Sequence, residues 1–100
     1  MTRTISFWPA AIEDMQQAYD WYELQQAGLG GEFVAAINST LDQVVIAPER
    51  FAKVNRRARE AIVKQFPFAL YFVPTSSSID VISVFHASRD PHEWRKRLRK

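Results

Sequence analysis

The sequence predicts an α+β fold in which an antiparallel helical hairpin packs on an antiparallel β-sheet. Two segments in the first half, 9–26 and 31–47, repeat apolar residues every three or four positions, which is typical of amphipathic helices. Three apolar segments in the second half, 59–66, 68–73 and 79–86, follow one another through short turns. That spacing favours a β-meander, and its exposed face would give the hairpin a surface to pack on.

Length and composition indicate a single domain over residues 1–100, with 47% apolar residues to form its core. The sequence contains no cysteine, which excludes disulfides and thiolate metal sites. No apolar stretch is long enough for a signal peptide core or a membrane span. We therefore expect a soluble, cytoplasmic protein with no membrane partner.

The first half is predicted to contain a strand and the two helices. Residues 4–8 alternate in polarity, and Pro9 suits the first turn of the helix that follows. Gly28 supplies a left-handed stop after that helix, and Pro48 ends the second. The expected apolar stripe of the first helix is Ile12, Met15, Tyr19 and Tyr22, with Ala11 and Ala18 beside them. That of the second helix is Phe33, Ile37, Leu41, Val44 and Val45.

The second half adds a short strand near 51–54 to the three main strands, and then a polar turn and a C-terminal helix. Strand 79–86 is apolar enough to be buried on both faces. Asp90 can cap the helix over 91–98, with Pro91 at its first position. Trp94 in this helix either fastens it to the sheet or contacts a partner, and the first interpretation is slightly favoured.

His86 ends the last strand and has two interpretations. An imidazole there could act as a general acid or base. It could also be a core histidine that bonds the backbone or Asp90, and we favour this structural role. The group His86, Asp90, His92 and Glu93 has a spacing that matches no established metal site, so we expect no metal and no cofactor.

Charge is distributed unevenly along the chain. Residues 1–49 carry one cation and seven anions, whereas residues 50–100 carry twelve cations and four anions. The cations form two blocks: Arg50, Lys53, Arg56, Arg57, Arg59 and Lys64, and then Arg89, Arg95, Lys96, Arg97, Arg99 and Lys100. Such blocks suit an acidic partner or a phosphate backbone, although charge also keeps a small domain in solution.

No glycine-rich phosphate loop, nucleophile elbow or catalytic carboxylate pair is present. Taken in order, however, the features resemble the RelE/ParE superfamily of toxin–antitoxin toxins, and its ParE branch more than its RelE branch. The resemblance covers nearly the whole chain and rests on the aromatic-rich segment 19–23, the turn 28–30, Phe33, Pro48, Arg57, the turn 66–68, and the segment 86–91 leading to Trp94.

The resemblance implies the toxin of a type II (plasmid-stabilisation) system that inhibits DNA gyrase by binding it. It implies neutralisation by a ParD-like, ribbon-helix-helix antitoxin whose acidic amphipathic segment covers the hairpin and a sheet edge. Expected target contacts are Arg89, Trp94, Arg95 and Arg97. Expected antitoxin contacts are Tyr19, Tyr22, Phe33, Ile37 and Leu41.

Two alternatives stay open. A RelE-like toxin would cut mRNA on the ribosome, with Arg57, Arg59 and Lys64 on phosphate and His86 as acid or base. RelE-type enzymes often place a tyrosine near the C-terminus, but no tyrosine follows Tyr71 here, which counts against cleavage. Whether the protein is an enzyme is therefore left open. The second alternative is a degenerate, non-toxic partner of an antitoxin.

Overall fold

The computed structural model describes residues 3–90 and 92–98 of the 100-residue chain. Its elements are β1 (Thr4–Phe7), α1 (Pro9–Gln25), α2 (Leu29–Ile46), the single 3-10 turn η1 (Pro48–Arg50), β2 (Ala52–Lys53), β3 (Arg59–Ile62), β4 (Phe68–Pro74), β5 (Ser78–His86) and α3 (His92–Arg97). The predicted α+β class, helical hairpin and C-terminal helix are confirmed. Within the described residues, no helix has the length and apolar character needed to cross a membrane.

The five strands form one sheet in the order β1-β5-β4-β3-β2. The pairs β2–β3, β3–β4 and β4–β5 are antiparallel, as the meander prediction requires. Strand β1 lies parallel to β5, with Thr4 opposite Ser78, so the complete sheet is mixed. A register shift between Tyr71 and Phe72 leaves Ile82 of β5 without an opposite residue, which is a β-bulge.

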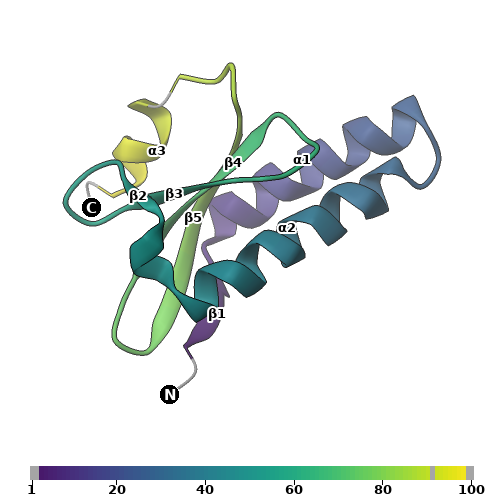
Figure 1. The fold of residues 1–100 in the computed structure, drawn as a ribbon. Coiled ribbons are helices and arrows are strands. Elements are labelled where there is room, and N and C mark those ends of the chain that lie inside the picture. The colour runs from purple at the N-terminus through teal and green to yellow at the C-terminus, as the bar shows by residue number, and fades with distance from the viewer. Residues whose placement is uncertain (1–2, 91, 99–100) are drawn as a thin grey trace.

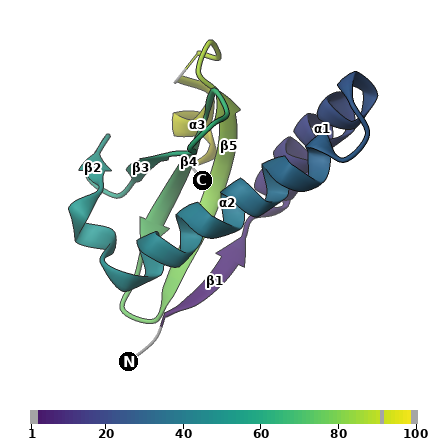
Figure 2. The same cartoon turned by 45° about the vertical axis from the view of Figure 1, so that its right-hand side comes forward.

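The hairpin covers one face of the sheet, and α3 lies against the other (Figures 1 and 2). The hairpin side holds the larger core, in which Phe33, Ile37 and Leu41 of α2 pack with Leu70 and Val81 of the sheet. The rings of Tyr22, Phe33, Phe66 and Phe68 meet at the end of this core near the β3–β4 turn. The smaller core consists of Ala58, Val73, Ile82, Phe85 and Trp94.

The buried side of α1 differs from its predicted stripe by one position. Ala11, Asp14, Ala18 and Tyr22 are buried, whereas Ile12 is 56% exposed. Met15 and Tyr19 lie at the margin of the core, because the helix turns Ala11 and Ala18 toward the sheet. Small side chains allow the helix to approach the strands closely.

The first strand of the predicted meander, 59–66, is shorter than expected, and β3 ends at Ile62. Gln65 has a left-handed φ of 71°, which a continuing strand cannot accommodate. Val63 still donates its N–H to Phe68 at 3.0 Å, so the chain closes a wide turn there.

The turn between the helices depends on two glycines and one carboxylate. Gly28 has the expected left-handed φ, 92°, but it lies before α2 as its N-cap and does not stop α1, which ends at the extended Gln26. Glu23 accepts the N–H groups of Gly28 and Gly30 at 3.1 and 2.8 Å. A Cβ on Gly30 would lie only 2.8 Å from the carbonyl oxygen of Tyr19, so the close approach of α1 and α2 requires glycine there.

Candidate functional site

Helix α3 is held on the sheet by Trp94, whose side chain is 0% exposed. The indole stacks on the ring of Tyr71, with centroids 4.9 Å apart and planes 17° apart. Burial of this kind contradicts the predicted contact between Trp94 and a target. The indole instead fixes α3 on the sheet.

Arg97 is also held inside the protein rather than offered to a target. Its guanidinium donates to both carboxylate oxygens of Asp14, at 2.8 and 3.1 Å, and to the carbonyl of Ile82 at 2.8 Å. The same carboxylate accepts the N–H of Val84 at 3.0 Å. The ion pair therefore satisfies the edge of β5 beyond the point where β1 stops, and the half-buried Arg97 serves the protein's own packing in this structure.

Arg89 is only partly available. Its guanidinium lies 2.7 Å from Glu93 and 3.7 Å from Asp14, and it covers the ring of Phe85 at 3.9 Å. Of the four expected target contacts, Arg95 is therefore the one that combines an exposed side chain with no ion pair among the described residues.

The β2–β3 loop places further exposed cations beside α3. Val54 and Ala58, at the two ends of the β2–β3 loop, pack in the same small core as Trp94 and Leu98. The side-chain oxygen of Asn55 orders the loop by accepting the backbone N–H of Arg57 at 2.8 Å and that of Ala58 at 2.7 Å. We name as the cationic end the five exposed residues Lys53, Arg56, Arg57, Arg95 and Lys96.

Tyr71 and Glu60 form a polar pair next to this end. The hydroxyl of Tyr71 donates to Glu60 at 2.9 Å. Burial, reinforced by the bond to Glu60, raises the pKa of Tyr71 to about 12. A phenol with this pKa keeps its proton at neutral pH, so it can donate a hydrogen bond but is a poor general base.

The four residues suggested for RNA cleavage are not gathered into one site. Arg59 donates to the carbonyls of Phe51 and Glu49, at 2.7 and 3.2 Å, which fixes the start of β3. Lys64 lies beyond the opposite end of that strand, and Arg57 lies in the exposed loop before it.

His86 is exposed, which contradicts the favoured core role. Its Nδ1 lies 3.0 Å from the backbone nitrogen of Ser88 and 2.8 Å from that residue's hydroxyl. Its predicted partner Asp90 instead accepts the backbone N–H of His92 at 2.9 Å. That bond lowers the pKa of Asp90 and agrees with its predicted capping role, whereas Pro91 lies outside the described residues.

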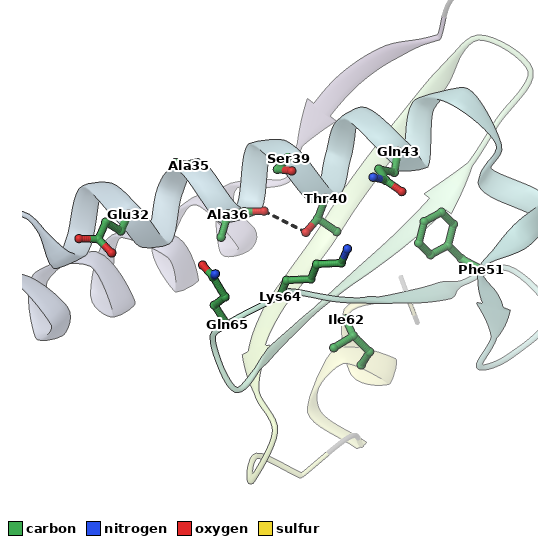
Figure 3. Close-up of a pocket in the computed structure, with 10 residues that line it drawn as sticks. All are labelled: Glu32, Ala35, Ala36, Ser39, Thr40, Gln43, Phe51, Ile62, Lys64 and Gln65. Carbon is green, nitrogen blue, oxygen red and sulfur yellow. Dashed lines mark hydrogen bonds between the residues drawn. The ribbon is translucent and has the colours of Figure 1, made fainter.

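A groove of about 550 Å³ runs between α2 and the outer edge of β3 (Figure 3). Thr40 and Gln43 of α2 face Phe51, Ile62 and Lys64 across it. Strand β2 pairs only with residues 59 and 60, so no strand of the described part of the chain lies beside β3 at Ile62. We call this feature the α2–β3 groove.

Four of the five expected antitoxin contacts belong to the core and not to this groove. Tyr22, Phe33, Ile37 and Leu41 are buried between the hairpin and the sheet, so the structure contradicts direct contacts with a partner. Tyr19 remains accessible in a second, apolar groove of about 350 Å³ between the two helices, beside Ile12 and Val34. Amphipathic periodicity marked the face that packs on the protein's own sheet.

Asp14 was not recognised from the sequence as a key residue. Its position in the row of Ala11, Ala18 and Tyr22 was the available signal, because a carboxylate on a buried face needs a partner. Among the described residues, no group of three or more histidine, cysteine or carboxylate side chains could hold a metal ion.

Comparison of the sequence with protein-family models and with curated proteins gives no match. Comparison of the structure with solved structures gives a match to a chain described as "Chromosomal ParDE TA system from P. aeruginosa". The TM-score is 0.73 at 15% sequence identity, and the match covers 84% of this chain and 95% of that one. The chain therefore has a ParE-like fold.

Proposed function

We propose that this protein is the toxin of a type II toxin–antitoxin system, acting on DNA gyrase by binding, in the bacterial cytoplasm. The observation that carries the proposal is the agreement of fold with a chain of a ParDE system over 84% of this chain and 95% of that one. A shared fold alone does not give a function, so the proposal also rests on the surfaces described above.

Binding is favoured over cleavage by the state of the residues that cleavage would need. Arg59 is engaged by two backbone carbonyls, and His86 lies at the far end of β5. RNA cleavage requires a base, an acid and cations around one scissile phosphate. A binding toxin needs only an accessible surface, and the cationic end is one.

We propose that a ParD-like antitoxin occupies the α2–β3 groove by adding a strand to β3. The edge of β3 is unpaired at Ile62, whose side chain is 66% exposed. Strand addition gives affinity through main-chain hydrogen bonds, and side-chain pockets beside the edge give specificity. An acidic segment would also meet Lys64 in this groove.

The target is tested by expressing the toxin without its antitoxin. Gyrase inhibition predicts impaired supercoiling and a DNA-damage response, with mRNA intact. Cleavage of translated mRNA with normal supercoiling would support a RelE-like nuclease instead. Normal growth with neither effect would leave a non-toxic antitoxin partner as the surviving function.

The antitoxin surface is tested with Ile62→Asp, which places a charge in the α2–β3 groove without disturbing the core. We expect the variant to lose at least 10-fold in antitoxin affinity. Leu24→Asp is the control, since Leu24 is similarly apolar and 84% exposed at the tip of the hairpin. Equal affinity of wild type and Ile62→Asp would place the antitoxin elsewhere.

A further inference from the structure

We propose that the cationic end binds the phosphate backbone of duplex DNA, independently of base sequence. Its five members come from two segments that are about forty residues apart in the chain and meet in the small core around Trp94. The choice of DNA over RNA rests on the proposed function, because gyrase holds duplex DNA. The contact with phosphate does not rest on it.

The charges of the cationic end are free to meet an anion. Among the described residues, none of its five side chains has a carboxylate within ion-pair distance, whereas the neighbouring Arg89 and Arg97 are both paired. Within α3 and the turn before it, Arg89 and Arg97 are thus engaged with carboxylates, whereas Arg95 is accessible. Accessible lysines and arginines release counterions when they neutralise phosphates, which drives association.

The opposite side of the molecule carries the opposite charge. Residues 9–46, which form the hairpin, contain six carboxylates and no lysine or arginine. A polyanion is thus repelled by the hairpin and attracted to the cationic end. The charge distribution orients the approach of a polyanion before contact is made.

The apolar content of the surface favours nucleic acid over an acidic protein. The exposed large apolar side chains of the described residues are Ile5, Ile12, Trp21, Leu24, Ile46 and Ile62, and none lies in the β2–β3 loop or α3. Protein interfaces concentrate apolar and aromatic residues at their centre and deplete charge there. Surfaces that bind DNA are more polar and much more positive.

The aromatic residues favour a duplex over a single strand. Single strands are held by aromatic rings on which the bases stack. Here the face of Trp94 is covered by Tyr71, and the exposed Trp21 lies in the hairpin. With no ring available among the described residues of the cationic end, phosphate contact is the interaction that this surface offers.

The test is fluorescence anisotropy of a labelled duplex of about 20 base pairs with the purified full-length chain, between 50 and 200 mM NaCl. If about four phosphates are neutralised, affinity falls by roughly 100-fold over this range. Arg56→Ala/Arg57→Ala and Arg95→Ala/Lys96→Ala should each reduce the slope of log K against log salt by about two units. Each pair should also weaken binding by roughly 10- to 100-fold near 100 mM salt.

The control is Gln17→Glu/Ala27→Glu, which changes net charge by the same amount at exposed positions of the hairpin. We expect this control to bind with less than 3-fold loss.

Three outcomes would overturn the proposal: an unchanged slope in both cationic pairs, an equal loss in the control, or tighter binding to single-stranded DNA or duplex RNA. Loss of antitoxin affinity in the cationic pairs with DNA binding intact would identify the surface as a protein-binding one. Because gyrase is absent from the assay, failure here leaves the proposed toxin function to its own test.

Discussion

The two faces of the sheet are covered in different ways. On one face, two long helices bury a continuous apolar row that includes Phe33, Ile37 and Leu41. On the other face, the six-residue α3 depends on the buried indole of Trp94 and on the partly buried ion pair between Arg97 and Asp14. We infer that the long helices, packed over a large apolar face, lose little stability when one contact changes. The short α3 loses its attachment when a single residue is replaced.

The two faces also differ in charge and in what they expose. The hairpin is anionic and presents grooves with apolar walls, and the α3 face presents cations around a small core. Under our proposals, the hairpin side receives the antitoxin and the α3 side meets the target. The predictions below test one side at a time, except Asp14→Ala, which tests the ion pair that joins α1 to α3.

The largest effect is expected from Trp94→Ala. Removal of a fully buried indole leaves a cavity and takes away the partner of Tyr71, which should lower the free energy of unfolding by about 3–5 kcal/mol. Trp21→Ala is the matched control, because Trp21 is 57% exposed, and it should cost about 1 kcal/mol or less. Urea denaturation of both variants measures this, and equal losses would contradict the assignment of Trp94 to the core.

Asp14→Ala should cost about 3 kcal/mol, because it leaves Arg97 and the N–H of Val84 without their partner in a buried place. Glu13→Ala removes the same charge from the exposed neighbouring position and should change stability by about 0.5 kcal/mol or less. If thermal unfolding moved equally in the two variants, the ion pair would not fasten α3.

Gly30→Ala tests the close approach of the helices. The new Cβ would lie 2.8 Å from the backbone oxygen of Tyr19 and 2.7 Å from Cγ of Glu23, so we expect a loss of about 1–3 kcal/mol. At the adjacent Gly31 a Cβ meets nothing within 4 Å, and alanine there should stabilise α2 by up to about 1 kcal/mol. Chemical denaturation should move the two variants in opposite directions, and a shift of both in one direction would refute the packing argument.

The smallest effect concerns pH. The folded protein holds the proton of Tyr71 up to a pKa of about 12, above its unfolded value of about 10. Its contribution is therefore complete below pH 10 and is lost as pH rises from 10 to 12, by about 1–2 kcal/mol. Tyr22, whose pKa is also raised by burial, acts in the same direction. Tyr71→Phe should flatten the decline of the free energy of unfolding over this pH range. An unchanged decline would show that ionisation of Tyr71 does not contribute to it.

The sequence was a good guide to the hairpin, the meander and the capping Asp90, because periodicity, glycine and proline act locally. It also identified the residues that divide the helices, since Gly28 adopts the expected left-handed φ. The parallel pairing of β1 with β5 could not be predicted, because it joins residues more than seventy positions apart without a local signal.

The candidate site was less predictable for the same reason. Trp94 and Arg97 are residue types that are common in binding surfaces, but here both contact the protein's own sheet. Only the placement of α3 on the sheet decides that these two side chains point inward while Arg95 is exposed. Likewise the expected antitoxin contacts Phe33, Ile37 and Leu41 were chosen from an apolar stripe that the protein buries itself. A sequence stripe gives the buried side of a helix and cannot tell an internal partner from an external one.

The proposal that the cationic end meets the target and the α2–β3 groove binds the antitoxin has one most direct test. Purified variants are added to DNA gyrase, and the amount of cleaved DNA is measured. We predict that wild type and Ile62→Asp both increase cleaved DNA, since we propose that the α2–β3 groove binds the antitoxin and not gyrase. The variant Arg95→Ala/Lys96→Ala should lose at least 10-fold in potency. Full potency of that pair, or loss of potency in Ile62→Asp, would contradict the assignment of the two surfaces.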